Sequence, residues 1–391
     1  MKTKLSYFML SVLVLLGVWR WWLLPAVDAG LNQYLGEGQP PISSEAERLH
    51  RSLLVGDLHA DSFLWARNLA DLSGYGHLDL PRARAGNLGI QVFTAVTKSP
   101  RGLNYHENAA DAVDNITLLA VAQGWPVRTW DSLLQRALYQ GERLHKLAAA
   151  VPERVVPVAS AAELREVLAR RDEGEGPLAA ILGIEGAHPL EGKLENIGVL
   201  YDAGFRVMGL QHFFDNELGG SLHGESGAGL TDFGRRAVLE MARRSIIIDV
   251  AHSSEAVVRE VLALTERPLM ISHTGLKGHC DSARNIPDAL MQAIAAGGGL
   301  VGVGFWDGAI CDPSPVSVVQ AIRYAVDLLG VEHVALGSDY DGTVAVTFDA
   351  GELGVLTEEM LRQGFSEYEI RRVMGENLRD FLLNQLPGGR G

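Results

Sequence analysis

Histidine and carboxylate residues recur directly after short apolar segments of this chain. They are His59, Asp61, Glu185, His212, His252, His273 and Asp339. A single histidine after a strand is usually a structural residue held by hydrogen bonds. The recurring pattern needs another explanation, because a buried ionisable group is costly unless it is paired or binds a metal ion. We therefore predict that these side chains share one metal site.

The donors of this site are imidazole nitrogens and carboxylate oxygens, without thiolates. Such donors favour Zn²⁺, with Mn²⁺ or Co²⁺ as alternatives. We expect His59 and Asp61 to bind one ion, His252 and His273 to bind a second, and Glu185 to bridge both. Two Zn²⁺ ions about 3.5–4 Å apart would share a hydroxide and polarise a scissile carbonyl.

Asp339 then remains as a carboxylate beside the expected hydroxide. A carboxylate in this place is suited to move a proton from the nucleophile to the leaving amine. The alternative role for Asp339 is that of a further metal ligand.

These residues need a scaffold that brings distant parts of the chain together. Apolar segments typical of strands buried on both faces alternate with helical stretches. The expected strands span residues 53–58, 89–96, 178–184, 206–210, 246–250, 269–271, 300–305 and 334–336. The alternation predicts an α/β fold, a (β/α)8 TIM-type barrel, in which the carboxyl ends of the strands form one catalytic rim.

Helices are expected between these strands. They span residues 107–123, 131–151, 161–171, 231–244, 254–264, 287–296 and 315–329. A doubly wound sheet fits less well, because it would carry a glycine-rich phosphate loop after its first strand. The sequence Gly-Asp-Leu-His-Ala-Asp stands there instead, at residues 56–61.

Charge and cysteine content narrow the range of partners. The 391 residues carry a net charge of −14, which argues against nucleic acid and against broad adhesion to anionic lipid. Cys280 and Cys311 have no metal-finger spacing, so a thiolate zinc site is excluded. The two cysteines could form a disulfide or remain free, and the sequence does not decide between them.

The N-terminus resembles an export segment. Lys2 and Lys4 precede the uncharged run Leu5–Trp19, and the residues Arg20-Trp21-Trp22 suit a membrane–water interface. Val27-Asp28-Ala29 offers a small-residue cleavage site, so a cleaved signal and a retained anchor both remain open. A buried N-terminal helix is a third, weaker alternative.

The expected organisation follows from these features. Residues 1–29 form a signal peptide or transmembrane anchor, 30–41 a linker, and 42–391 the barrel domain. We expect an exported protein, either periplasmic or membrane-anchored with its catalytic domain outside the cytoplasm. A homodimer is compatible with the sequence.

Several motifs together resemble the renal (membrane) dipeptidase family, peptidase family M19. They are His59-x-Asp61, Gly-Ile-Glu-Gly at 183–186, Gly-Leu-Thr-Asp-Phe-Gly at 229–234, Ile-Asp-Val-Ala-His-Ser at 248–253, Ile-Ser-His at 271–273, Ala-Arg-Asn-Ile-Pro-Asp at 283–288 and Gly-Ser-Asp-Tyr-Asp-Gly at 337–342. The resemblance runs in the order of the family from about Val55 to Leu383.

This resemblance implies a binuclear zinc enzyme that cleaves dipeptides and tolerates a D-residue at the C-terminal position. It implies that His59, Asp61, Glu185, His252 and His273 are the metal ligands, with Glu185 bridging. It further implies a catalytic, substrate-binding His212, a substrate-carboxylate-binding Arg284 and an acid/base Asp339. A guanidinium suits a carboxylate because it can bind both oxygens, although an ion pair with Asp288 is an alternative role for Arg284.

The loop after His212, residues 213–221, resembles a bacterial branch of the family rather than the mammalian enzyme. Because this loop is expected beside the substrate, another amidohydrolase activity on the same centre remains an alternative, such as a lactonase or an acyl-amino-acid hydrolase. An exported binding protein with an inactive site is a further one. No apolar tail precedes Gly391, so we expect any anchor at the N-terminus.

Overall fold

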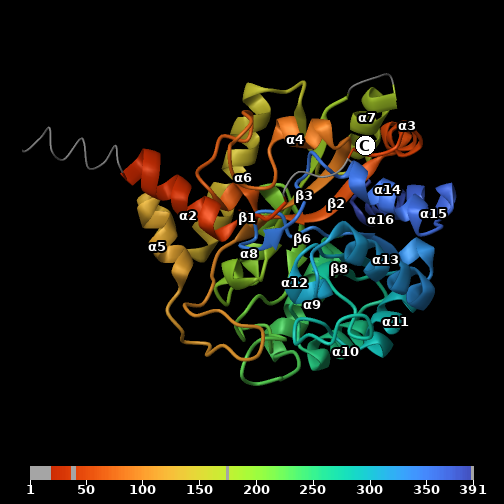
Figure 1. The fold of residues 1–391 in the computed structure, drawn as a ribbon. Coiled ribbons are helices and arrows are strands. Elements are labelled where there is room, and N and C mark those ends of the chain that lie inside the picture. The colour runs from red at the N-terminus through yellow and green to blue at the C-terminus, as the bar shows by residue number, and fades with distance from the viewer. Residues whose placement is uncertain (1–18, 37–40, 173–175, 389–391) are drawn as a thin grey trace, which may run out of the picture.

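A closed ring of parallel strands forms the centre of the molecule (Figure 1). The computed structural model describes residues 19–36, 41–172 and 176–388. The strands of the ring follow one another in the order β3-β2-β10-β9-β8-β7-β6-β5, and β5 pairs with β3 to close it. These strands are β2 (Val55–Ala60), β3 (Leu88–Val96), β5 (Leu178–Glu185), β6 (Phe205–Gly209), β7 (Ile247–Asp249), β8 (Met270–Thr274), β9 (Leu300–Val303) and β10 (Val334–Leu336). The predicted TIM-type barrel is confirmed.

Each predicted strand segment overlaps one strand of the ring. Two short pairings in the described part of the chain were not predicted. β4 (Val155–Pro157) pairs with the first residues of β5, and β1 (Gln33–Tyr34) pairs with β11 (Ala345–Val346). Both involve strands of two or three residues, which are too short to produce a recognisable sequence pattern.

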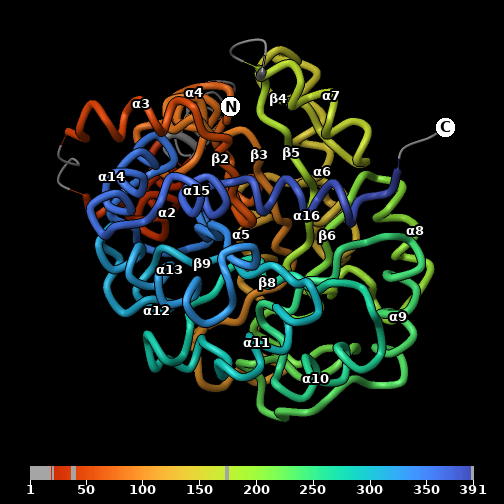
Figure 2. Tube along the Cα trace, turned by 90° about the vertical axis from the view of Figure 1, so that its right-hand side faces the viewer, coloured from red at the N-terminus to blue at the C-terminus, as the bar shows by residue number. Residues whose placement is uncertain are grey.

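Helices surround the ring, and Figure 2 shows them as an outer layer around the strands. They are α2 (Leu24–Leu31), α3 (Ser44–Ser52), α4 (Leu80–Ala85), α5 (Asn115–Ala122), α6 (Leu133–Ala150), α7 (Ala161–Asp172), α8 (Glu195–Asp202), α9 (Asp232–Arg243), α10 (Glu255–Leu264), α11 (Asp288–Ala296), α12 (Asp307–Ile310), α13 (Pro315–Leu329), α14 (Gly354–Arg362), α15 (Glu367–Arg371) and α16 (Asn377–Gln385). The segments expected to be helical overlap α5, α6, α7, α9, α10, α11 and α13.

The expectation of one helix over residues 107–123 is wrong in its first half. α5 begins only at Asn115, because the Asp114 carboxylate accepts hydrogen bonds from the backbone N–H groups of Ile116 and Thr117. Such a cap starts a helix at the residue that follows it. In the segment before α5, the side chain of Asn108 donates a hydrogen bond to the backbone oxygen of His223.

Side chains fill the interior of the ring below the site. The strands contribute apolar residues such as Leu58, Val207 and Met270 to one buried cluster. Leu378 and Leu382 of α16 join this cluster near the start of β2 and close that end of the barrel. The carboxyl ends of the strands therefore form the end at which a site can open, as in other barrels of this type.

An N-terminal arm, residues 24–35, packs on the barrel near this rim. Asp28 of α2 is buried, and its Oδ2 accepts a hydrogen bond from Arg67 Nε at 2.9 Å. Arg67 also forms an ion pair with Asp341, with Nη2 and Oδ1 2.7 Å apart. Asn32 Oδ1 accepts from the backbone N–H of Thr343, so the arm contacts the loop after β10.

The arm includes residues that we expected to be a linker. Contacts with the barrel therefore start before Ile42, whereas the boundaries of the signal or anchor and of the linker remain predictions. Among the described residues, no helix has the length and apolar character needed to cross a membrane. The run Leu5–Val18 lies outside the described residues, as do residues 37–40 of the expected linker.

Cys280 and Cys311 form a disulfide. It links the loop after β8 to the residue that follows α12. The loop after β8 also carries Arg284, so the disulfide restrains the segment from which this side chain projects.

Candidate metal centre

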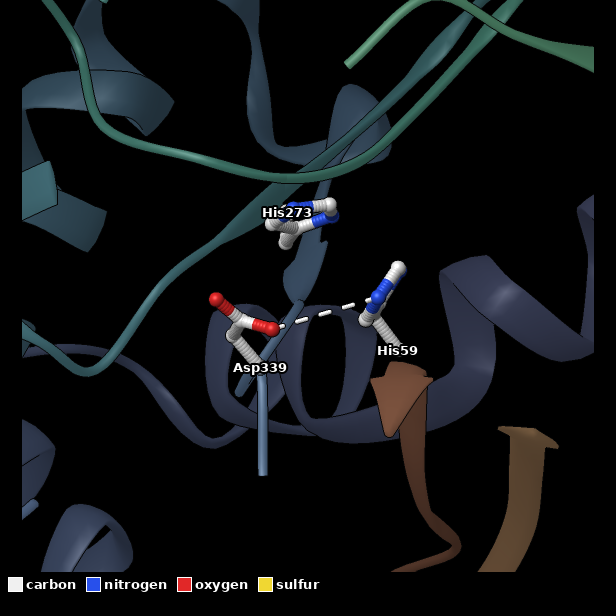
Figure 3. Close-up of side chains that lie close together, drawn as sticks. All are labelled: His59, His273 and Asp339. Atoms are coloured by element: carbon white, nitrogen blue, oxygen red, sulfur yellow. Dashed lines mark ion pairs between the residues drawn. The ribbon is translucent and has the colours of Figure 1, made fainter. Parts of the chain in front are cut away.

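The predicted site residues meet at the carboxyl ends of the strands. His59 belongs to β2, His273 to β8, and Asp339 follows β10, and Figure 3 shows these three side chains converging. His59 Nε2 lies 3.9 Å from Asp339 Oδ1. All three side chains are buried.

Glu185 lies at the centre of the cluster. Its Oε1 atom is 3.0 Å from His252 Nε2, 3.3 Å from His273 Nε2 and 3.6 Å from His59 Nε2. His59 Nε2 is in turn 3.5 Å from Asp61 Oδ1. One carboxylate therefore faces both predicted ligand pairs, as a bridging ligand must.

The side chains form overlapping groups in which the ligand atoms lie within 4.8 Å of one another. These groups are His59 with Asp61 and Glu185, Glu185 with His212 and His252, and His59 with His273 and Asp339. Imidazole and carboxylate donors at such separations can bind metal ions. The third group keeps open the alternative that Asp339 is a ligand.

A buried hydroxyl orients two of the histidines. Ser272 Oγ donates to Asp249 Oδ2 at 2.6 Å, which leaves its lone pairs to accept hydrogen bonds. His59 Nδ1 lies 3.0 Å from this oxygen and His273 Nδ1 lies 2.9 Å from it. With the hydroxyl hydrogen directed at Asp249, each Nδ1 donates to Ser272 Oγ and each Nε2 is directed at the cluster, which is the orientation that a metal-binding histidine needs.

The environment of His59 Nε2 also indicates that a metal ion binds here. This atom is buried and has no hydrogen-bond partner among the described residues. A buried polar atom without a partner is costly. A metal ion bound at this point would satisfy it, so the residues fit a metal centre.

The electrostatics of the cluster also favour a cation. Burial and the neighbouring Asp61 raise the pKa of Glu185 well above its usual value. Burial lowers the pKa of His252 and of His273 well below the usual value. Burial alone would lower the pKa of His59, but Asp61 and Glu185 raise it to about 10. A cation would keep the carboxylates charged and would replace the proton on His59.

His212 lies beside this cluster rather than at its centre. Its Nδ1 atom donates to the backbone oxygen of Lys98 at 3.0 Å, which leaves Nε2 as the inward atom. Nε2 lies 3.3 Å from Glu185 Oε2. Because burial lowers the pKa of His212 to about 4, the ring is neutral near pH 7.

Asp339 has a left-handed backbone conformation, as do Asp341 and Thr343 of the same loop. Its φ of 61° lies in the left-handed region, which a residue other than glycine adopts only when its surroundings impose it. Burial raises the pKa of Asp339 to about 8. A carboxyl group with such a pKa can both accept and release a proton near neutral pH.

Arg284 is a buried cation without an anionic partner among the described residues. Its Nη1 donates to the backbone oxygen of Ala251 at 2.9 Å and its Nη2 to that of His273 at 2.7 Å. Asp288 does not pair with it, because this carboxylate accepts instead from Tyr324 and Gly278. The remaining N–H donors of the guanidinium are available to a ligand.

A cavity joins Arg284 to the cluster. Its polar wall contains Asp61, Glu185, His212, His252, His273, Arg284 and Asp339. Its other wall contains Leu64, Val96, Leu103, Tyr105, Ile116, Phe213, Trp306 and Val344. All the predicted site residues therefore meet in one place, with His59 directly behind the cavity.

The sequence did not indicate Ser272, Tyr105 or Trp306 as parts of the site. Ser272 stands in the Ile-Ser-His motif, but a hydroxyl next to a histidine is too common to be informative by itself. Tyr105 and Trp306 come from loops, and a hydrogen bond of 2.9 Å from Trp306 Nε1 to the Tyr105 hydroxyl joins them. Only the folded structure brings these two rings together.

The closed barrel and the buried histidine–carboxylate cluster at its rim define the class of metal-dependent hydrolases. The chain belongs to the membrane dipeptidase family, peptidase family M19, whose sequence profile matches residues 43–381. The predicted family, and with it a hydrolytic metallopeptidase, is confirmed.

Individual relatives agree with this assignment. The chain is 27% identical to the dipeptidase aclJ of Aspergillus oryzae over 360 residues, which cover 86% of this chain and 79% of that protein. A Rhodobacter sphaeroides metallopeptidase, solved with a phosphinate mimic of the dipeptide L-Ala-D-Ala, is 25% identical with a TM-score of 0.68, covering 85% of this chain and 99% of its own. The probable dipeptidase PvdM of Pseudomonas aeruginosa shares the fold, with a TM-score of 0.72 at 20% identity, covering 88% of this chain and 97% of its own.

Proposed function

We propose that this protein hydrolyses dipeptides with two zinc ions, and that it tolerates a D-residue at the C-terminal position. The observation that carries the proposal is the small cavity in which a buried, unpaired guanidinium faces a cluster of metal-binding side chains. A dipeptide supplies both groups that such a cavity needs, an amide carbonyl and a terminal carboxylate. The L-Ala-D-Ala mimic bound to the Rhodobacter sphaeroides metallopeptidase supports the substrate class.

His59 and Asp61 would hold one ion, His252 and His273 the other, and Glu185 would contact both. The distances of Glu185 Oε1 to the three imidazole nitrogens support this assignment. Bound there, two zinc ions would lower the pKa of a shared water and polarise the scissile carbonyl.

The protein side chains would bind the substrate and move the proton. Arg284 would bind the C-terminal carboxylate through its free N–H donors, and this sets the distance from that carboxylate to the cluster. Asp339 would accept the proton of the attacking water and deliver it to the leaving amine. His212 would contact the substrate near the scissile carbonyl, where its Nε2 points toward the cluster.

The cavity leaves little room beyond two residues. The apolar side chains of Leu64, Ile116 and Val344 and the indole of Trp306 form its wall. A longer peptide would have to extend past this wall or past Arg284. We therefore expect free dipeptides with small or apolar side chains to be the preferred substrates.

We further propose that the catalytic domain lies outside the cytoplasm. The charged start and uncharged run of the N-terminus support export. The disulfide between Cys280 and Cys311 agrees with an oxidising compartment.

Metal analysis combined with a substrate panel tests the proposal. We expect close to two zinc equivalents per chain and the highest kcat/KM with free dipeptides, including those with a C-terminal D-residue. One equivalent that does not rise on addition of zinc would contradict the binuclear site. Preferred turnover of lactones or N-acyl amino acids would assign the centre to another amidohydrolase activity.

A further inference from the structure

An apolar surface lies beside the mouth of the active-site cavity. α5 contains no charged residue, and its sequence is Asn-Ile-Thr-Leu-Leu-Ala-Val-Ala. Ile116 and Ala120 are buried against the barrel, whereas Leu118 is 60% exposed and Val121 is 46% exposed. A surface helix normally turns a polar face to water, whereas the outer face of α5 exposes apolar side chains.

The N-terminal arm and the helical turn before it, Trp19–Leu23, extend this surface. Trp22 is 76% exposed, and Leu23, Val27 and Leu31 follow at a helical spacing of four residues and are also exposed. The single charged residue of α2, Asp28, is buried and bound to Arg67, so it does not interrupt the exposed stripe.

A hydrogen bond joins the two helical segments. Trp19 Nε1 donates to the backbone oxygen of Ala122, the last residue of α5, at 2.8 Å. Figure 1 shows α2 and α5 side by side at one edge of the molecule. We give the name α2–α5 surface to the exposed side chains of α5, of the arm and of the turn before it, which are Leu118, Val121, Trp22, Leu23, Val27 and Leu31.

The position of Trp19 indicates what covers this surface. The uncharged run Leu5–Trp19 of the sequence ends at this residue, so the apolar segment meets the folded domain at the end of α5. A segment of this composition partitions into a bilayer. A bilayer that contains this segment therefore lies close to Trp19, and the α2–α5 surface is the neighbouring apolar surface.

We infer that the α2–α5 surface rests in the interfacial region of a lipid bilayer, which places the mouth of the active site beside the membrane. Exposed tryptophan and leucine side chains on a helix are typical of interfacial binding. Because the six named side chains carry no charge, their own contact with lipid depends on apolar burial and not on anionic headgroups. Ile116 of α5 also lines the active-site cavity, so the mouth lies next to the lipid. This inference rests on the retained-anchor alternative for the N-terminus and not on the proposed dipeptidase reaction.

Site-specific fluorescence quenching on the full chain tests the inference. Since both native cysteines are in the disulfide, a single introduced cysteine can carry an environment-sensitive dye. Leu118→Cys places the dye on α5. Leu239→Cys is the matched control, because Leu239 is a similarly exposed leucine, 48% accessible, on α9 at another side of the barrel.

Both labelled proteins are reconstituted with neutral phosphatidylcholine vesicles that carry nitroxide-labelled lipid. We expect the dye at position 118 to be quenched at least about threefold more strongly than the dye at position 239, independent of salt concentration. Zinc-dependent activity of both proteins confirms that the fold is intact.

Two outcomes would overturn the inference in distinguishable ways. If the full chain failed to associate with the vesicles, the anchor would be wrong and the surface proposal with it. If the chain associated but the two dyes were quenched equally, the surface would face another occupant. A blue-shifted but unquenched dye at position 118 would identify that occupant as protein, either a second copy or residues 1–18. None of these results would bear on the hydrolysis of dipeptides.

Discussion

The substitution Arg284→Lys tests whether Arg284 binds the substrate carboxylate, because it leaves the predicted metal ligands unchanged. The native guanidinium donates to the backbone oxygens of Ala251 and His273 and still keeps N–H donors that face the cavity. A lysine has one ammonium group, which cannot satisfy both carbonyls and also bind two carboxylate oxygens.

The size of the effect follows from the hydrogen bond that is lost. A hydrogen bond to a charged group is worth about 1.5–3 kcal/mol, which corresponds to about a 10- to 150-fold decrease in kcat/KM. Free dipeptides should show this decrease. Dipeptide amides should already be poor substrates of the unmodified protein, and the substitution should affect them much less.

Two controls exclude indirect effects. Because Arg284 binds the carbonyl of His273, the zinc content of the variant must be measured and should not change. Arg206→Lys is the matched variant, since Arg206 also binds backbone oxygens, those of Ala159 and Tyr201, but lies away from the cavity. If free acids and amides lost activity equally in Arg284→Lys, Arg284 would have a structural role and the carboxylate would be bound elsewhere.

Three further predictions concern single side chains. Asp339→Asn should retain zinc and lose most turnover in steady-state assays, because an amide cannot carry the proton; loss of one zinc equivalent would instead make Asp339 a ligand. Ser272→Ala removes the hydroxyl that orients His59 and His273, so a competing chelator should extract zinc at about 10- to 100-fold lower concentration; an unchanged zinc affinity would rule out this orienting role. Burial lowers the pKa of His188 from 6.5 to about 3. Between these two pH values the unfolded chain binds a proton that the folded protein does not, so the free energy of unfolding is highest above pH 6.5 and decreases as the pH falls toward 3. His188→Gln should therefore reduce the pH dependence of urea unfolding in the zinc-free protein over this range by up to about 1.4 kcal/mol per pH unit, and an unchanged slope would contradict the shift.

The sequence was sufficient to predict the ring and the ligand cluster for one physical reason. In a barrel of parallel strands, the residues at the carboxyl end of each strand lie on the common rim. The positions of His59, Glu185 and His273 therefore followed from the strand pattern alone. No knowledge of side-chain packing was needed.

Other features depend on contacts between distant residues, which a sequence pattern does not contain. The segment before α5 is not helical, because Asn108 donates a hydrogen bond to the backbone oxygen of His223, 115 positions away in the chain. The hydroxyl of Ser272 acquires its role only when β2 and β7 bring His59 and Asp249 to it. The pairing of Cys280 with Cys311 likewise depends on how the loop after β8 packs against α12.

The buried ion pair between Asp28 and Arg67 has a practical consequence for any recombinant form of this protein. A chain that starts after Ala29 would leave Arg67 in the interior with Asp341 as its remaining ion-pair partner among the described residues. Asp341 lies two positions after Asp339, so the change would reach the loop that carries the proposed proton carrier. Removal of Asp28, whether by truncation or by cleavage of a signal peptide after Ala29, would thus change the charge balance beside this loop, so activity should be compared between chains with and without residues 19–29.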